Sequence, residues 1–374
     1  MQITNVNFAL GGMNVQTWDL PSPLRSYLLA WGRNQYGQLG LGNTSDRSSP
    51  VQVGTLTNAN IGIDTSSSHN LIIKTDGTMW SWGSGTNGRL GLGDTNDRSS
   101  PVQIGALTTW SRIAAGGDHS VAIKTDGTMW SWGYNAFSQL GLGNTSSISS
   151  PVQIGAETTW SRISAGFNHS VAIKTDGTLW SWGRNNYGQA SGANVPEQVG
   201  AGTAWSNISS SHNHNLVIKN DGTLWAWGLN ANGQLGLLDT STRYNNNGPV
   251  QIGALNTWAN MGAGGYHGMA VKTDGTLWSW GYNGNGQLGH GNTTNRSSPV
   301  QVGALTTWSS VNSGALHSLA VKADGTLWAW GSNSYGRLGL GDTNDRSSPT
   351  QVGALTAWLN ISAGYWHSLA SDME

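Results

Sequence analysis

The chain has 374 residues, enough for two or three average domains or for one large repetitive domain. Only 10% of the residues are charged and the formal net charge is −1, which excludes the basic surface that binds nucleic acids or acidic membranes. Cysteine is absent, so disulfides, thiolate nucleophiles and Cys-ligated zinc are excluded too. No apolar stretch approaches membrane-spanning length, and we expect no membrane insertion.

The first 25 residues stand outside the pattern that fills the rest of the chain. Their start, MQITNVNFALGG, has neither the basic region nor the continuous apolar run of a secretory signal. Phe8 and Trp18, set among alternating apolar residues, argue against a purely solvated tail. We predict that residues 1–25 form a leader or docking arm and that residues 26–374 form one separate domain.

From residue 26 onward the sequence repeats seven times. A Trp-Gly dipeptide recurs at spacings of 51, 50, 50, 45, 53 and 50 residues, and a histidine keeps the same period. The tryptophans are Trp31, Trp82, Trp132, Trp182, Trp227, Trp280 and Trp330, and the histidines are His69, His119, His169, His214, His267, His317 and His367. Each unit contains about four short strand patterns separated by turn residues, and no helical period is present. A period near 50 residues with this content predicts an all-β, seven-bladed propeller.

An Asp-Gly dipeptide within each of the first six units predicts a tight hairpin, as at residues 126–127. A two-residue type I′ turn there would place Ile123 opposite Trp130 and Val121 opposite Trp132. One face of the blade would then carry large side chains and the other small ones. We expect the tryptophan pair of one blade to fill the space left by the small residues of the next.

The seventh unit ends without its Asp-Gly turn. The segment 26–32, SYLLAWG, matches the missing strand, and in a closed ring it can pair with residues 367–371, HSLAS. We expect Leu369 to lie opposite Trp31, and the closure to remove the open strand edges of a linear array. The residues that we assign to this ring closure are Leu29, Trp31, His367 and Leu369.

Three patterns resemble functional sites, but simpler interpretations are favoured for each. The seven histidines recur identically, so we expect their ring nitrogens to bond backbone groups inside their own blade. His212 and His214 form a His-x-His pair without a third ligand. The loops at Asp94 and Asp342, GDTNDRSSP, are explained by Asx-turns as well as by calcium. We predict no catalytic residue, no metal site and no cofactor.

Five arginines occupy equivalent loops: Arg47, Arg98, Arg243, Arg296 and Arg346. We expect ion pairs with an adjacent aspartate or with a neighbouring blade, and a broken ligand ring is the alternative.

Two loops break the repeat, one shortened at residues 184–200 and one expanded at residues 236–251. They should lie side by side on one rim, where variable loops over a rigid scaffold bind partners, although drift without function explains them equally. The candidate partner-binding residues are Arg184, Asn186, Tyr187, Asn194, Arg243, Tyr244 and Asn246.

The motif WGRNQYGQLGLG at residues 31–42, with the following SSPVQVG strand and the AGxxHS…DGTLWSWG hairpin, resembles the repeat of the regulator of chromosome condensation family. The resemblance covers about residues 26–371 and implies a seven-bladed propeller. Family members exchange nucleotide on a small GTPase, sense UV-B light or inhibit a β-lactamase. Here there is no basic tail, and no tryptophan stands two residues before a repeated histidine, so neither nucleotide exchange nor photoreception is expected.

We therefore predict a non-enzymatic protein-interaction or structural module that displays loops on a rigid ring to a protein partner. Low charge, richness in Asn, Thr, Ser and Gly, the absence of cysteine and a docking arm would suit a phage or viral virion component. The alternative is a soluble inhibitor or regulator that covers a partner enzyme's active site with one face of the propeller. The lack of a visible secretory signal leaves the localisation open.

Overall fold

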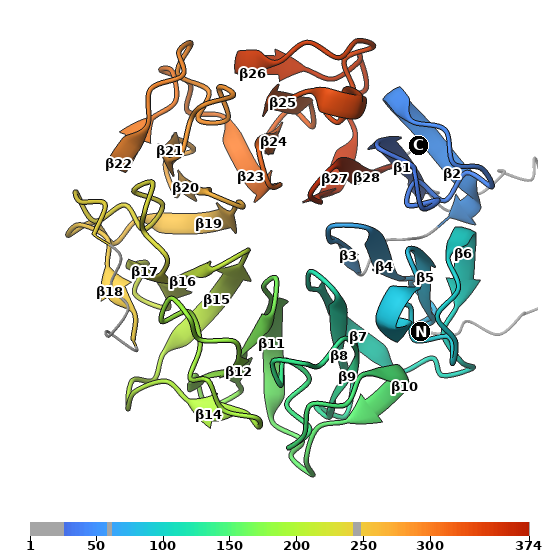
Figure 1. The fold of residues 1–374 in the computed structure, drawn as a ribbon. Helices are drawn as coiled ribbons and strands as arrows, with labels where there is room; N and C mark the ends of the chain where they lie inside the picture. Colours follow the sequence, from blue (N-terminus) through green and yellow to red (C-terminus); the bar gives the residue numbers. More distant parts are fainter. Residues whose placement is uncertain (1–25, 58–61, 242–247, 374) are drawn as a thin grey trace, which may run out of the picture.

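Seven four-stranded antiparallel sheets surround a central axis in the computed structural model, which describes residues 26–57, 62–241 and 248–373. Figure 1 shows these sheets as the blades of a ring, each with its first strand nearest the axis. The predicted all-β, seven-bladed propeller is confirmed. The predicted leader, with Phe8 and Trp18, lies outside the described residues.

Blades 1 to 6 each run through four consecutive strands from the axis outward. Blade 1 contains β3 (Gly62–Thr65), β4 (His69–Ile73), β5 (Met79–Gly83) and β6 (Arg98–Gln103), blade 2 contains β7 (Trp110–Ala115), β8 (His119–Lys124), β9 (Met129–Gly133) and β10 (Ile148–Gln153), and blade 3 contains β11 (Trp160–Ala165), β12 (His169–Lys174), β13 (Leu179–Gly183) and β14 (Glu197–Gln198). Blade 4 contains β15 (Trp205–Ser210), β16 (His214–Lys219), β17 (Leu224–Gly228) and β18 (Val250–Gln251), blade 5 contains β19 (Trp258–Ala263), β20 (His267–Lys272), β21 (Leu277–Gly281) and β22 (Arg296–Gln301), and blade 6 contains β23 (Trp308–Ser313), β24 (His317–Lys322), β25 (Leu327–Gly331) and β26 (Arg346–Gln351). Two short 3-10 helices, η1 (Thr86–Gly88) and η2 (Ser334–Gly336), follow β5 and β25.

The closing blade joins the two ends of the chain, as predicted. It contains β27 (Trp358–Ala363), β28 (His367–Met373), β1 (Ser26–Gly32) and β2 (Arg47–Thr57). Gly32 pairs with His367 as Gly133 pairs with His119, so the closure copies the register of the other blades without a turn. The predicted register was wrong by one residue, because Leu369 lies opposite Ala30 and Trp31 lies opposite Ser368.

The hairpin turn differs from the predicted type I′ turn, and this explains the shift in register. The Lys124 N–H donates to the Thr128 carbonyl and the Gly127 N–H to the Lys124 carbonyl, both at 3.0 Å, which closes a three-residue loop. Only Gly127 has a positive φ, of 78°, whereas a type I′ turn needs two such residues. The Asp126 carboxylate instead accepts bonds from the Thr128 N–H and hydroxyl, at 2.9 and 2.7 Å.

A shift of one residue moves side chains to the other face of a strand. Ala122 therefore lies opposite Trp130 and Ser120 opposite Trp132, so the tryptophans share a face with small residues of their own blade. The other face carries aliphatic side chains. In the contact between blades 1 and 2, Leu71 of the aliphatic face packs in one cluster with Trp132. Each tryptophan face thus meets the aliphatic face of the preceding blade, not a row of small residues.

Hydrogen bonds link each blade to the next, as seen between blades 2 and 3. His119 Nε2 lies 2.9 Å from Ser170 Oγ, and the Ser170 hydroxyl donates to the Gln139 carbonyl at 2.9 Å. Trp182 Nε1 donates to the same carbonyl at 2.8 Å. The prediction that the histidines bond inside their own blade was therefore wrong, because the ring reaches a side chain of the neighbour.

The links repeat around the ring with one exception. All seven Trp-Gly tryptophans donate Nε1 to a backbone carbonyl of the preceding blade. Six histidines contact a serine or asparagine of the following blade through Nε2. His214 has no such side-chain partner because Gly268 occupies the equivalent position in blade 5.

We predict that acid unfolds the propeller through these histidines. Burial lowers the pKa of His119 to about 3 and of His169 to about 4, from the ordinary value of 6.5. The unfolded chain therefore binds protons below pH 6.5 that the folded chain excludes, and stability falls with pH by up to about 1.4 kcal/mol per pH unit for each such histidine. Asp64 acts in the opposite sense, since burial raises its pKa to about 6.

Urea unfolding at pH 7, 5.5 and 4.5 measures this dependence. The His119→Gln variant should be less stable at pH 7 and should lose stability with a shallower slope. A free energy of unfolding that stays constant from pH 6.5 to 4.5 would contradict the prediction.

Deleting residues 26–32 should destabilise the whole ring, whereas deleting residues 1–24 should not. The first deletion removes β1, which pairs with both β2 and β28. Thermal unfolding followed by circular dichroism compares the two variants, and equal midpoints would disprove a closure held by β1.

Candidate functional site

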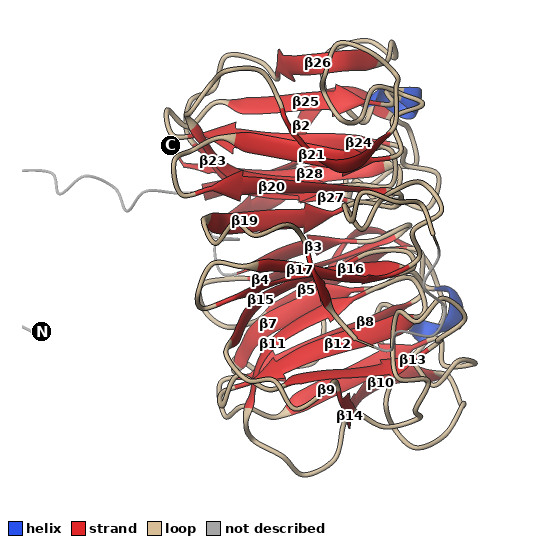
Figure 2. Ribbon diagram, turned by 90° about the vertical axis from the view of Figure 1, so that its left-hand side faces the viewer, coloured by secondary structure: helices blue, strands red, loops and turns tan. Residues whose placement is uncertain are grey.

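Two faces of the disc differ in the loops that they carry. One end of the disc holds the loops before the repeated histidines and the loops that follow each Trp-Gly, and we call this end the histidine face. We call turn face the opposite end, where the Asp-Gly turns lie and where Ser26 pairs with Met373. In the side view of Figure 2, the 3-10 helices lie at one edge of the disc and the C-terminus at the other.

An asymmetric run of rings crosses the axis on the histidine face. We call it the aromatic arc, and it consists of Phe167, His212, Tyr266, Tyr365, Trp366 and Tyr335. Neighbouring ring centroids lie between 4.4 and 5.9 Å apart. Three of the rings also line an axial cavity of about 90 Å³, whose other lining residues are small and come from all seven blades. Large side chains from a few blades thus cover a channel that the repeat lines with Ser, Gly, Ala and Thr.

Two buried rings of the arc, His212 and Tyr365, are uncharged at neutral pH. Burial lowers the pKa of His212 to about 4, and it raises the pKa of Tyr365 above its ordinary value. Both rings stay neutral as a result, and they offer apolar faces with polar edges, a combination common in protein interfaces.

The outer end of the arc is shaped by an arginine at a position that most blades give to glutamine. Gln38 shows the common arrangement, in which its side-chain oxygen accepts the Tyr36 N–H at 2.8 Å. Arginine has no acceptor. In blade 6, Arg337 Nε instead donates to the Ser334 carbonyl at 3.0 Å. The loop there forms η2, with Tyr335 at a φ of +64°, a conformation uncommon for a non-glycine residue.

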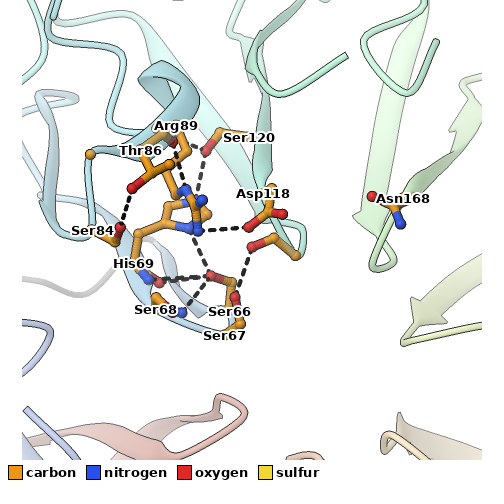
Figure 3. A network of polar contacts seen from close by, with 12 residues as sticks. Ser66, Ser67, Ser68, His69, Ser84, Thr86, Arg89, Asp118, Ser120 and Asn168 are labelled. Carbon is orange, nitrogen blue, oxygen red and sulfur yellow. Dashed lines mark hydrogen bonds and ion pairs between the residues drawn. The ribbon is translucent and has the colours of Figure 1, made fainter. Parts of the chain in front are cut away.

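Blade 1 carries the same substitution, and its charge is neutralised. Arg89 Nη1 lies 2.7 Å from Asp118 of blade 2, and Arg89 Nε donates to the Thr86 carbonyl. Figure 3 shows this pair beside His69 and Ser120. The arginine and the carboxylate close the contact between blades 1 and 2 on the histidine face.

The contact between blade 6 and the closing blade is built differently. Arg337 is fully buried, and Trp366 stands where Asp118 stands in blade 2, with its ring 4.6 Å from the guanidinium. Arg33 lies over the rings of Tyr335 and Trp366, at 4.9 and 5.7 Å. Burial, with a smaller effect of nearby Arg33, lowers the pKa of Arg337 to about 10, although Asp345 acts to raise it.

The model of the regulator of chromosome condensation (RCC1) repeat matches most of the chain. The matched residues are 27–73, 76–123, 126–173, 221–271, 274–321 and 324–371. The chain belongs to the RCC1 repeat family. A second model of the same repeat matches residues 160–189 and 205–234, so that neither model matches residues 190–204, which include most of the shortened loop of blade 3.

Curated relatives share this repeat over short stretches. The chain is 39% identical to the ultraviolet-B receptor UVR8 of Arabidopsis thaliana over 82 residues, 22% of this chain and 19% of the receptor. It is 34% identical to the regulator of chromosome condensation of Drosophila melanogaster over 90 residues, 23% of this chain and 16% of that protein. The aligned region thus spans less than a fifth of the length of either relative.

Solved structures share the whole RCC1 fold. Prp20p from Saccharomyces cerevisiae, a protein studied for its binding to Gsp1p and histones, superposes with a TM-score of 0.82 at 22% identity and covers 94% of this chain and 92% of its own. Human WBSCR16 gives a TM-score of 0.82 at 20% identity, covering 93% and 98%. At these identities the likeness establishes the fold alone.

The shortened loop that is predicted to bind a partner contacts blade 2. Arg184 stacks over Phe137 at 4.7 Å, and Asn194 donates to the Gly143 carbonyl of blade 2 at 3.3 Å. The shortened loop therefore contacts the blade before it. Asn186 is exposed, and Tyr187 bonds Gln189 through its backbone N–H. Arg243, Tyr244 and Asn246 fall outside the described residues.

Two of the five rim arginines pair with an aspartate other than the adjacent one, whereas the side chains of Arg47 and Arg296 donate to backbone carbonyls of their own loop. Arg98 lies 2.6 Å from Asp94, four residues earlier, and Arg346 repeats this contact with Asp342. The adjacent Asp97 instead accepts a backbone N–H of the Trp-Gly loop at 2.9 Å. Asp94 also accepts the Asn96 N–H, which is the Asx-turn expected for this loop. Among the residues that the structure describes, no three His, Asp or Glu side chains gather as metal ligands.

Sequence reasoning missed the outer end of the arc. Arg337 and Trp366 break the RCC1 repeat in ways visible in the sequence, as an arginine in a glutamine position and a tryptophan directly before a repeated histidine. Their meeting was not visible, because they come from opposite sides of a contact between two blades. In the described part of the chain, no helix is long and apolar enough to cross a membrane.

We predict that Asp118→Asn destabilises the propeller by about 1–3 kcal/mol, because it leaves Arg89, with only 7% of its side chain exposed, without its counter-charge. Asp94→Asn is the matched control, since the Arg98–Asp94 pair is 27% and 39% exposed and its loss should cost about 1 kcal/mol or less. Urea unfolding measures both, and equal losses would contradict the assignment.

Proposed function

We propose that the protein is a non-enzymatic interaction module that binds a protein partner through its histidine face. The aromatic arc is the observation that carries this proposal. It breaks the seven-fold symmetry, brings tyrosine and tryptophan rings together beside Arg33, and lies across the axis where a partner can reach several blades at once. These three residue types dominate the binding energy of protein interfaces.

The architecture supports such a role. Inter-blade bonds hold the loops in place before binding, so a partner loses little free energy in ordering them. A protein of the same fold binds other proteins, since yeast RCC1 (Prp20) forms a complex with Kap60 and has been studied for its binding to Gsp1p and histones. From this similarity we infer for the present chain only that it binds a protein, and the purification experiment below identifies the partner.

A role without catalysis fits the distribution of titratable groups. The buried histidines repeat around the ring as structural links, whereas a catalytic centre concentrates unlike groups at one place. The ligases HERC5 and HERC2 of Homo sapiens match this chain over 9% and 2% of their own length, so the match covers a small part of each ligase.

The narrower hypotheses stay predictions. A virion role rests on composition and on the proposed docking arm with Phe8 and Trp18, and an inhibitor role rests on the closed ring with one broad face. The loops at residues 184–200 and 236–251 remain a proposed second contact area at the rim. The identity of the bound partner separates these roles, since a structural protein of a particle favours the first and a soluble enzyme the second.

Affinity purification from an extract of the source cells tests whether the partner binds to the histidine face. The immobilised wild-type chain is compared with a Tyr335→Ala/Trp366→Ala variant of the arc. The matched control is Leu107→Ala/Leu305→Ala, which removes exposed leucines from loops of the turn face. We expect the partner, quantified by mass spectrometry, to decrease at least tenfold with the arc variant only. Circular dichroism confirms that all three proteins are folded.

A partner that both variants retain equally, or one lost only with the leucine variant, would contradict the assignment of the histidine face.

A further inference from the structure

We propose that the contact between blade 6 and the closing blade binds a carboxylate side chain from an acidic segment of the protein partner. This inference rests on the proposed function and specifies the chemistry of the partner at one end of the arc. The residues that form the site are Arg33, Tyr335, Arg337 and Trp366.

The equivalent contact between blades 1 and 2 shows what is missing. There the buried arginine, Arg89, has a carboxylate partner in Asp118 at 2.7 Å. Arg337 occupies the same position and makes the same backbone bond through Nε, and its Nη1 donates to the Tyr365 carbonyl at 3.2 Å, where Arg89 has a carboxylate; its Nη2 is buried and has no hydrogen-bond partner. A buried donor without an acceptor costs free energy, and a buried charge without a counter-charge costs more. The fold therefore contains the cation of this pair without its anion.

The balance of charge differs between the two contacts in the same way. Between blades 1 and 2, Arg89 lies near Asp118 and Asp97, and Tyr134 occupies the position after Trp-Gly. Between blade 6 and the closing blade, Arg33 and Arg337 both lie against the ring of Trp366. Asp46 accepts the backbone N–H of Asn34, next to Arg33, and Asp345 is the acidic group that acts on Arg337. Its two oxygens already accept bonds from the Asn333 N–H and the Asn285 side chain.

No carboxylate of the residues that the structure describes forms an ion pair with Arg33 or Arg337. Arg33 bonds the neutral side chain of Gln35. On a chain with few charges, two neighbouring arginines that form no ion pair with the described residues make a local positive site.

The site is accessible from the histidine face. Tyr335 is 40% exposed, and Arg33 and Trp366 are half-buried. The left-handed backbone of Tyr335 places its ring 5.9 Å from that of Trp366, so the two rings support the Arg33 guanidinium. A guanidinium that is already fixed by neighbouring rings loses less conformational entropy on binding a carboxylate than a mobile guanidinium does. The two oxygens of a carboxylate also match the planar N–H donors of arginine. Arg337 below Trp366 adds attraction without direct contact.

Fluorescence anisotropy of a labelled peptide tests the site. The probe is a fluorescein-labelled peptide with six consecutive glutamates, and the same peptide with six glutamines is its neutral counterpart. We expect the folded wild-type chain to bind the glutamate peptide at least tenfold more tightly than the glutamine peptide, and the difference to shrink as salt is raised.

Variants locate the binding on the propeller. Arg33→Gln should weaken binding of the glutamate peptide at least tenfold. Arg98→Gln is the matched control, because Arg98 lies on the rim of the same face and is already paired with Asp94, and its binding should stay within twofold. Trp366→Asp supplies the internal carboxylate that blade 2 has in Asp118, so it should abolish peptide binding while the chain remains folded.

Equal binding by the Arg33→Gln and Arg98→Gln variants would overturn the proposal, as would equal binding of the two peptides. Tighter binding of a 12-nucleotide single-stranded DNA than of the glutamate peptide would also overturn it, since the site would then prefer phosphate. Failure here is distinct from failure of the proposed function. If the partner purified from extracts still depends on Tyr335 and Trp366, the histidine face binds a partner of different chemistry.

Discussion

Hydrogen bonds between neighbouring blades are the interaction on which the rest of the structure depends. A backbone carbonyl such as that of Gln139 accepts both the indole of Trp182 and the hydroxyl of Ser170 from the next blade, while His119 reaches forward to the same serine. Buried polar groups need partners, and for these indoles, serines and histidines the partner belongs to a neighbouring blade. Each blade is therefore completed by the next one, and a closed ring supplies such a partner at every contact between blades except that of the His214 Nε2 atom.

Closure of the ring explains why the two ends of the chain share one sheet. The carbonyl of Arg337 accepts the indole of Trp31, which lies 306 residues earlier in the sequence. His367 in turn reaches Asn70 of blade 1, so the closing blade is bonded on both sides. The same closure brings Arg33 against Trp366 and Tyr335. The seam that holds the ring together is thus also the seam that carries the proposed carboxylate site.

Function in this ring is expected where the repeat departs from its own rule. Where arginine replaces glutamine, the side-chain acceptor is lost, the residues directly before the arginine form a 3-10 turn, and a buried charge is introduced. Blade 1 compensates the charge within the chain through Asp118, and blade 6 does not. Two copies of one substitution therefore have different consequences, one that stabilises a contact between blades and one that leaves a cation for a partner.

The sequence by itself determined the blades and their closure. Turn residues and strand patterns are local to each repeat, and together with the seven-fold period they agree with a closed ring of seven blades. It did not determine the strand register, since Asp126 could serve either as a type I′ turn residue or as an acceptor for Thr128, and the bonds formed decide between them. It also did not reveal the aromatic arc. Phe167, His212 and Tyr365 lie far apart in the chain and come together only over the axis. The tertiary structure alone decided the site, because contacts between blades depend on how the whole ring closes and not on any one repeat.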